Sequence, residues 1–323
     1  MKVLVTGAAG FLGSHLTERL VELGHKVKAL IHYDSNNNWG WLENSKYKNE
    51  IEFVVGDIRD FDSVYSAMQG VDQVFHLAAL IGIPYSYSSP LAYVKTNIEG
   101  TYNVLQSSKF LNTGNIIITS TSETYGTAQY VPIDEKHPIV GQSPYSATKI
   151  SADSLAVSYY RSFNLPIKIV RPFNIYGPRQ SARAIIPSIG IQILNGIEKI
   201  SLGNIEAKRD LTFVKDTVEG FIEISGQKKF NGEGVNIGMN HEISIKELVE
   251  KISKILSTKV QIVLDKKRIR PSKSEVDRLK CDNSKLKNNT NWTPKYDLDK
   301  GLKETLEWLD ENKKLFKHNI YNK

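Results

Sequence analysis

Short apolar runs alternate with longer amphipathic runs through the first 170 residues of the chain. Apolar runs of four or five residues, bounded by polar or turn-forming residues, predict strands, whereas apolar positions three to four residues apart predict helices. The predicted strands are residues 2–5, 27–31, 51–55, 73–77, 115–119 and 167–170, and the clearest helices are residues 11–23, 90–111 and 143–163. This alternation is typical of an α/β fold with a Rossmann-like, doubly wound parallel sheet and helices on both faces.

The regular alternation ends after Gly177. Helical patterns follow at residues 184–195, 216–225, 244–256 and 298–312, with short predicted strands at 199–202, 235–237 and 260–264 and a charged loop at 205–210. We therefore expect a smaller, mixed α/β C-terminal unit that covers the sheet as a lid. We assign residues 1–176 to a dinucleotide-binding domain, to which residues 211–238 return, and residues 177–323 mainly to a substrate domain.

Composition is that of an ordinary globular protein, with 40% apolar and 24% charged residues among 323. The single cysteine, Cys281, excludes an internal disulfide framework and favours a reducing compartment, so we expect a cytoplasmic location. Glycines interrupt the apolar N-terminal run, which argues against a signal peptide. No stretch approaches the roughly 18 apolar residues of a membrane span, so we expect no membrane partner.

The net charge of +7 is compatible with an anionic substrate, an anionic surface or nucleic acid. Most of the positive excess lies after residue 265, where lysines alternate with acidic and apolar residues as in KGLKETLEWLDENKK. This pattern is typical of a solvated helix face. We find no basic-aromatic motif and expect no nucleic-acid partner.

Three glycines, Gly7, Gly10 and Gly13, follow the first predicted strand and open the first predicted helix. Glycines in this position let backbone N–H groups approach a pyrophosphate, and a helix N-terminus offers partial positive charge. The triplet alone is a weak signal that a tight turn could also explain. Its place between a strand and a helix makes a dinucleotide cradle the better interpretation.

The residues after the second strand bear on the choice of cofactor. NAD-binding proteins usually have an acidic residue there for the ribose hydroxyls. Asp34 comes a few positions late and could instead be a loop residue, while His32 is the nearest residue that could help hold a 2′-phosphate. We predict NAD and leave NADP open. Asp57, after the third strand, is predicted either to accept from the adenine amine or to cap a helix.

Tyr145 and Lys149 are four residues apart and share one face of the helix predicted at 143–163. A lysine ammonium lowers the pKa of a nearby tyrosine, and the phenolate can take the proton of a sugar hydroxyl while a hydride leaves the same carbon. The alternative is that Tyr145 and Lys149 are two residues of one helix without a catalytic role. Thr121, at the end of the strand 115–119, is placed to orient the same hydroxyl.

Glu123 adds a second chemical step to this site. Once a sugar carbon is oxidised to a ketone, the neighbouring C–H becomes acidic, and a carboxylate can act as general base. Loss of that proton with the next hydroxyl expels water, after which hydride returns to the new alkene carbon. The alternative is a salt-bridged or capping loop residue. Glu123 therefore favours oxidation followed by elimination.

These residues resemble the extended short-chain dehydrogenase/reductases, and among them the nucleotide-sugar 4,6-dehydratases. The resemblance rests on GxxGxxG at residues 7–13, HLAA at 76–79, TSETYG at 121–126, YSATK at 145–149, RPFNIYGPR at 171–179, KRDLTFVKD at 208–216 and RPSKSEV at 270–276. It implies a catalytic set of Thr121, Ser122, Glu123, Tyr145 and Lys149. It implies cofactor contacts from Gly7, Gly10, Phe11, Leu12, Gly13, His32, Asp34, Asp57, Ile58, Leu77, Ala78, Ala79, Asn97, Tyr145, Lys149 and Pro172.

The same resemblance implies substrate contacts, for which a surface or packing role is the alternative. The implied residues are Ser86, Glu123, Asn174, Arg179, Arg183, Arg209, Arg270 and Glu275, with Glu275 at the nucleotide ribose. Arginine suits a diphosphate because its planar fork donates two parallel bonds. No metal site is expected.

Ser122 departs from the Thr-Asp-Glu of many glucose dehydratases, in which the aspartate protonates the leaving hydroxyl. The GDP-mannose dehydratases instead read Thr-Ser-Glu, as this chain does. A serine hydroxyl is a poor acid, so we predict that Glu123 delivers the proton it took from C5 to the departing C6 hydroxyl. Ser122 would then only position the group.

A narrower resemblance, to the N-acetylglucosamine nucleotide 4,6-dehydratases of the legionaminic-acid pathway, rests on ALIGIPYSYSSP, PIDEKHP, QSPYSATK and RQSARAIIP. It implies a UDP- or GDP-linked N-acetylglucosamine substrate, a 4-keto-6-deoxy product and a role in cell-surface polysaccharide biosynthesis. It also implies a homodimer through a four-helix bundle formed by residues 90–111 and 143–163.

Three other functions stay open from the sequence. A nucleotide-sugar 4-epimerase would use Tyr145 and Lys149 without elimination, and Glu123 argues against it. A simple reductase is the second alternative. A cofactor-sensing binding protein without turnover is the third, and the complete catalytic set argues against it.

Overall fold

The computed structural model describes residues 1–317 and residue 320. Its centre is a seven-stranded sheet in the order β11-β6-β5-β4-β1-β2-β3, in which every neighbouring pair is parallel. The strands are β1 (Lys2–Thr6), β2 (Lys26–Ile31), β3 (Ile51–Val55), β4 (Gln73–His76), β5 (Asn115–Thr119), β6 (Ile167–Pro172) and β11 (Gly234–Ile237). The predicted Rossmann-like sheet is confirmed, and its edge strand β11 comes from the C-terminal half of the chain.

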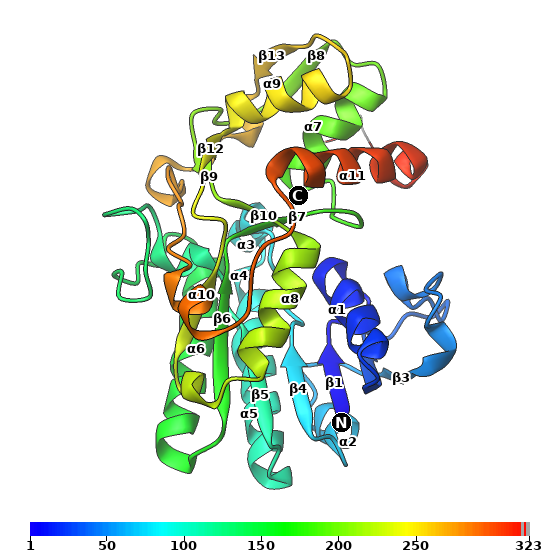
Figure 1. The fold of residues 1–323 in the computed structure, drawn as a ribbon, viewed down its shortest axis with the longest axis vertical. Coiled ribbons are helices and arrows are strands. Elements are labelled where there is room, and N and C mark those ends of the chain that lie inside the picture. The colour runs from blue at the N-terminus through cyan, green and yellow to red at the C-terminus, as the bar shows by residue number, and fades with distance from the viewer. Residues whose placement is uncertain (318–319, 321–323) are drawn as a thin grey trace.

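Helices cover both faces of this sheet because its strands are apolar on both sides (Figure 1). Val3 and Val5 of β1 point into a core shared with α1 (Phe11–Glu22) and α8 (Val214–Ser225). Leu4, between them, faces the other core, under α2 (Phe61–Met68) and α5 (Gly100–Leu111). On that second face α6 (Pro144–Phe163) packs beside α5. Period-2 alternation along β1 thus builds the two cores.

The predicted helix at 90–111 forms as three consecutive segments. These are α4 (Pro90–Tyr93), a π-helical turn η3 (Val94–Glu99) and α5, preceded by the short α3 (Ile83–Ser88). π-helical turns within α-helices are frequent at functional sites because they displace side chains from the regular helical face. Asn97 lies in this turn and is buried.

The C-terminal unit has its own apolar core, built from α7 (Ile185–Leu194), α9 (Ile245–Ile255), α11 (Leu298–Glu311) and the parallel pair β8 (Lys199–Leu202) and β13 (Gln261–Leu264). Ser244 caps α9 in a reciprocal capping box with Glu247. In Figure 1 this unit lies above the carboxyl ends of β1 and β4. The carboxyl ends are where open α/β sheets bind ligands.

Two small strand pairs connect the sheet to this unit. One is β7 (Asn174–Tyr176) with β10 (Leu211–Phe213), and the other is β9 (Lys208–Arg209) with β12 (Ile243–Ser244). The prediction of a charged loop over 205–210 was therefore wrong in part, because its last residues pair with a distant strand. The structure also contains α10 (Ser284–Asn289) and several 3-10 turns, including η1 (Gly40–Leu42), η2 (Lys48–Glu50), η4 (Ser122–Tyr125), η5 (Lys228–Phe230), η6 (Lys266–Arg268), η7 (Ser272–Ser274) and η8 (Lys313–Leu315).

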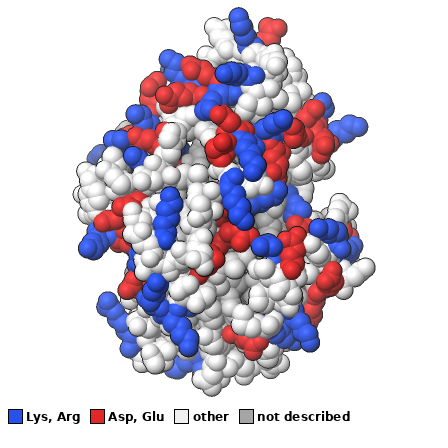
Figure 2. All heavy atoms as spheres, in the orientation of Figure 1, with Lys and Arg blue, Asp and Glu red and all other residues white. Residues whose placement is uncertain are grey.

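Basic and acidic side chains are interspersed on the face shown in Figure 2. Such a surface has no extended field of one sign on that face. Within the described part of the chain, no helix combines the length and the apolar character that crossing a bilayer requires.

Candidate active site

The glycine turn between β1 and α1 is crowded by backbone on all sides. Gly7 has a φ of +69°, and a Cβ built on it would lie 2.8 Å from the amide nitrogen of Ala78. A Cβ on Gly13 would lie 2.1 Å from the carbonyl oxygen of Gly7. Gly10 N–H donates to that same carbonyl at 3.1 Å. Only glycine fits at positions 7 and 13, and the resulting turn leaves the N-terminus of α1 open to a pyrophosphate.

Thr6 fastens the end of β4 beside this turn. Its hydroxyl accepts from the N–H groups of Leu77 and Ala78, both at 3.1 Å, and lies 2.8 Å from Nδ1 of His76. His76 Nε2 in turn lies 3.1 Å from the hydroxyl of Thr101. Burial lowers the pKa of His76 to about 3, so the ring is neutral. Thr6 and Thr101 were missed from the sequence because nothing local marks a hydroxyl whose partner lies 70 or 25 positions away.

The residues expected to contact the adenosine of the cofactor lie on separate loops, and two of them, His32 and Asp57, lie close together. Asp57 accepts from the backbone N–H of Arg59 at 2.9 Å and forms a two-nitrogen contact with its guanidinium. That contact lowers the pKa of Asp57 to about 2. His32 Nε2 lies 3.5 Å from the Asp57 carboxylate. Asp34 accepts from Asn36 N–H at 3.0 Å, as a turn residue does.

The alternative of Asp57 as a helix cap was wrong, because Asp60 caps α2. Ile58 is buried, and its carbonyl accepts from Asn103 Nδ2 at 3.0 Å. Phe11 and Leu12 open α1 and pack against the core of the C-terminal unit. Arg59 carried no sequence motif and was also missed.

Tyr145 and Lys149 lie on the first turns of α6 and are almost completely buried, with 6% and 4% of their surfaces exposed. A capping box between Ser143 and Ser146 starts the helix there. Burial raises the pKa of Tyr145 well above its usual value, although a hydrogen bond with Thr121 lowers it. The expected net lowering was therefore wrong, because desolvation of the phenolate outweighs the favourable contacts. Burial also lowers the pKa of Lys149 to about 8.

Thr121, Ser122 and Glu123 lie where β5 ends, with η4 beginning at Ser122. Thr121 Oγ1 accepts from Glu123 N–H at 3.2 Å, which turns the chain so that Glu123 is only partly buried. The Glu123 carboxylate contributes to the raised pKa of Tyr145. Thr121, Glu123 and Tyr145 are thus neighbours, although 24 residues separate Thr121 from Tyr145 in the sequence. Ser122 is buried within the turn.

A cluster of charged side chains faces Glu123 from the C-terminal unit. Arg209, buried on β9, lies 3.4 Å from Glu275, and Arg270 lies 3.5 Å from the same carboxylate oxygen. Burial lowers the pKa of Arg209, whereas the Glu123 and Glu275 carboxylates raise it. Asn174 lies across from Leu211 in the β7–β10 pair, and its buried Oδ1 has no hydrogen-bond partner. An unpaired buried acceptor is compatible with a ligand that donates a hydrogen bond.

Other residues expected to bind substrate or cofactor have partners within the protein. Ser86 donates to the Ile83 carbonyl at 2.7 Å, and Arg179 pairs with Glu18 of α1 at 2.9 and 3.1 Å. Arg183 Nε lies 3.2 Å from the Ser181 hydroxyl. These groups support the loops around the site in this structure.

Asn97 and Pro172, also predicted to contact the cofactor, make structural contacts within the protein. The Asn97 amide bonds both backbone groups of Leu80, at 2.9 and 3.0 Å, and the Thr148 hydroxyl at 3.0 Å. Asn97 thereby holds the chain after Ala79 against α6. Pro172 ends β6 and pairs with Ile237 of β11.

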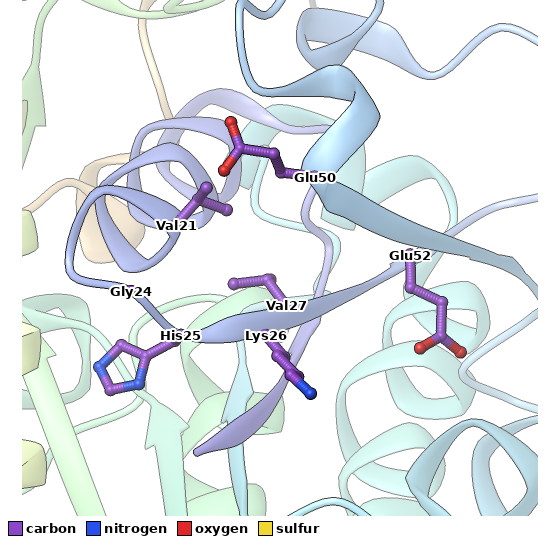
Figure 3. A pocket seen from close by; sticks show the side chains of 7 residues that line it. All are labelled: Val21, Gly24, His25, Lys26, Val27, Glu50 and Glu52. Carbon is purple, nitrogen blue, oxygen red and sulfur yellow. The ribbon is translucent and has the colours of Figure 1, made fainter.

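A cavity of about 390 Å³ lies elsewhere, at the amino ends of β2 and β3. Figure 3 shows its lining, which includes Val21, His25, Glu50 and Glu52. None of the predicted site residues lines it, and ligands of open α/β sheets bind at the opposite edge. Among the described residues, no group of three or more His, Cys, Asp or Glu side chains is arranged to hold a metal ion.

Comparison with known proteins identifies the family. The family model described as GDP-mannose 4,6 dehydratase matches residues 4–305. This chain belongs to the GDP-mannose 4,6-dehydratase family. The match spans both the glycine turn and the arginine cluster, so the dehydratase-family resemblance is confirmed.

Proteins named for different reactions are similar to the chain. A UDP-N-acetyl-alpha-D-glucosaminuronate decarboxylase of Bacillus cytotoxicus is 32% identical over 96% of this chain and 98% of the relative. A putative UDP-glucose 4-epimerase of Methanocaldococcus jannaschii is 30% identical over 96% and 99%. The structure of DesIV, a dTDP-glucose 4,6-dehydratase of Streptomyces venezuelae with NAD bound, has a TM-score of 0.89 and 28% identity, covering 98% of this chain and 99% of that one.

Proposed function

We propose that the protein is an NAD-dependent nucleotide-sugar 4,6-dehydratase, a hydro-lyase acting on UDP- or GDP-linked N-acetylglucosamine. The observation that carries the proposal is the position of Glu123, partly exposed beside the buried Tyr145. Family membership supports the reaction class, and the narrower sequence resemblance supports the amino sugar. NADP stays a second candidate cofactor.

The glycine turn fits a dinucleotide, because its backbone is too crowded for any side chain at Gly7 or Gly13. Bound NAD would supply the hydride acceptor for sugar C4 and the hydride donor for C6. Gly7, Gly10 and the N-terminus of α1 would hold its pyrophosphate, and Leu77 and Ala78 would lie beside it. His32, Asp34 and Asp57 would border the adenosine.

Tyr145 takes the proton of the C4 hydroxyl in the first step. Its phenolate is costly to form in a buried position, so the Lys149 ammonium one turn away must stabilise the developing charge. Thr121 bonds with Tyr145 and orients the substrate hydroxyl.

Glu123 then takes the C5 proton, which the C4 ketone has made acidic, and delivers it to the C6 hydroxyl. Water leaves from C6 as the C5–C6 double bond forms. Hydride return to C6 is then matched by a proton added at C5, so the proton that Tyr145 took from the C4 hydroxyl balances the net reaction. Ser122 is buried in the turn and positions Glu123. The Arg209 guanidinium faces Glu123 across the site.

Arg209, Arg270 and Asn174 are the proposed contacts of the substrate diphosphate. In the structure both arginines contact the Glu275 carboxylate. When substrate binds, Glu275 would lose one of these contacts and accept a hydrogen bond from the nucleotide ribose. Arg179, Arg183 and Ser86 stay predicted substrate contacts that would require their present partners to be displaced.

We also propose a homodimer. Exposed apolar side chains line the two long helices, among them Leu91, Val94, Tyr102, Phe110 and Phe163. Two copies would bury these residues in a four-helix bundle. A cytoplasmic location and a part in legionaminic-acid synthesis stay predictions from the sequence.

Two related activities have specific support. The Methanocaldococcus relative favours 4-epimerisation and the Bacillus relative favours C6 decarboxylation of a uronate sugar, which could begin with the same C4 oxidation. Both would use Tyr145 and Lys149. Only the dehydratase expels water.

A mass measurement separates these activities. The purified protein with NAD is incubated with UDP-N-acetylglucosamine, GDP-N-acetylglucosamine and UDP-N-acetylglucosaminuronate in turn. Loss of one water from either of the first two supports the proposal. An isomer of unchanged mass would replace it with epimerisation, and loss of carbon dioxide from the third, alone, would replace it with decarboxylation. Glu123→Gln is expected to abolish water loss, and normal water loss in that variant would exclude Glu123 as the base.

A further inference from the structure

A buried carboxylate, Asp153, lies one helical turn beyond Lys149 on α6, with 5% of its surface exposed. Its Oδ2 accepts from the Ser120 hydroxyl at 2.8 Å and from Nε and Nη2 of Arg171 at 3.2 and 3.1 Å. Its Oδ1 is buried and has no hydrogen-bond partner. Both oxygens of a buried carboxylate usually have hydrogen-bond partners, so the unpaired Oδ1 of Asp153 requires an explanation.

The partners of Asp153 belong to the segments that carry the site. Ser120 immediately precedes Thr121 at the end of β5, and Arg171 precedes Pro172 at the end of β6. Arg171 Nη1 donates to the Tyr125 hydroxyl at 3.1 Å, and that hydroxyl donates to Asn236 of β11 at 2.8 Å. One carboxylate therefore ties the helix of Tyr145 and Lys149 to the ends of two strands.

Asp153 is the acidic residue one helical turn beyond Lys149 on α6, and it forms an ion pair with Arg171. Tyr145 and Asp153 lie one helical turn before and after the lysine on α6, and the Lys149 charge acts on His76 of β4. His76 is neutral, and Tyr145 is neutral until its phenolate forms. Arg171 on β6 pairs with Asp153 and contacts Tyr125 in η4, and Glu123 faces Tyr145. Burial lowers the pKa of Lys149 and the Asp153 carboxylate raises it.

We propose that Asp153 is a positioning residue that keeps Lys149 in its ammonium form and fixes the catalytic helix against the strand carrying Thr121. The proposal deepens the proposed function, on which its catalytic meaning rests. Its electrostatic part concerns only residues of this chain. A carboxylate whose charge is fully compensated by Arg171 would leave the titration of Lys149 unchanged.

The test is an NMR titration of Lys149 in protein carrying ¹³C at lysine Cε, as purified and with saturating NAD. The signal is assigned by its loss in Lys149→Arg. In Asp153→Asn we expect the Lys149 pKa to fall by about one unit or more. Asp153→Glu should restore most of the difference, because it keeps the charge on the same helical face.

Ser120→Ala is the matched control, because it removes one hydrogen bond to Asp153 and keeps the carboxylate. Its Lys149 pKa should stay at the wild-type value. Asp153→Asn leaves Arg171 buried without its partner, which can prevent folding. Asp153→Asn/Arg171→Met removes both charges of the pair, and in this variant too the Lys149 pKa should fall.

An unchanged Lys149 pKa in Asp153→Asn, or in the double variant if the single one does not fold, would overturn the proposal. An equal fall in Ser120→Ala would overturn it as well, since general loosening would then explain the effect. The titration needs no substrate, so its outcome is independent of which sugar the enzyme uses. If the protein is a dehydratase, the pH above which its rate falls should decrease in Asp153→Asn, together with the Lys149 pKa.

Discussion

Gly13→Ala tests the cofactor cradle at its tightest point. The added Cβ would lie 2.1 Å from the Gly7 carbonyl oxygen, 2.8 Å from its carbon and 2.9 Å from Ala8 Cα. All three atoms are backbone, so no flexible side chain can move aside. The whole turn between β1 and α1 must shift, and with it the N–H groups that would face the pyrophosphate.

The expected cost follows from this overlap. Overpacking typically costs about 1–3 kcal/mol, and the preference of helices for alanine over glycine returns about 1 kcal/mol. The unliganded protein should therefore lose at most about 2 kcal/mol, or roughly 3 °C in Tm. The larger effect is on binding. NAD at 100 times its Kd should stabilise the wild type by about 2.7 kcal/mol, and this gain should vanish in the variant.

Thermal unfolding of cofactor-stripped protein, with and without NAD, measures both quantities, and isothermal titration gives Kd directly. Gly226→Ala is the matched control. Gly226 follows α8 with a φ of −72°, and the nearest atom to a Cβ there is 3.6 Å away. This control should melt and bind like the wild type. If Gly13→Ala kept wild-type NAD affinity, the assignment of this turn to the pyrophosphate would be wrong.

Three further predictions concern the supports of the site. Arg179→Ala should lower stability by about 1 kcal/mol by freeing Glu18, and a KM close to wild type would show that Arg179 does not bind substrate. For His76, the folded-state pKa of about 3 lies below the unfolded value of about 6.5, so its stabilisation is full above pH 6.5 and is lost as pH falls toward 3. Urea unfolding from pH 7 to pH 4 should show a loss of about 3 kcal/mol from this group, and His76→Gln should flatten the curve. Asp210 accepts three backbone N–H groups, at 2.7, 3.0 and 3.3 Å. Asp210→Asn should cost about 1–3 kcal/mol in urea unfolding, because its amide cannot accept all three.

Much of the fold was predictable because its signals are local. Period-2 and period-3.6 patterns mark the strands and helices of the sheet, and glycines 7, 10 and 13 mark a turn that only small residues can form. Tyr145 and Lys149 were predictable for the same reason, since a spacing of four places both on one face of one helix. The β9 strand was not, because two residues in a charged segment become a strand only by pairing with Ile243 and Ser244.

The sequence by itself determined the sheet, the glycine turn and the residue types of the catalytic set. Only the tertiary structure decided how their charges behave. It set the raised pKa of Tyr145, because burial depends on what packs over a helix. It also paired Asp153 with Arg171 and Arg179 with Glu18, across 18 and 161 positions of the chain. Such contacts depend on distances between separate elements, and a local pattern of residues carries no record of them.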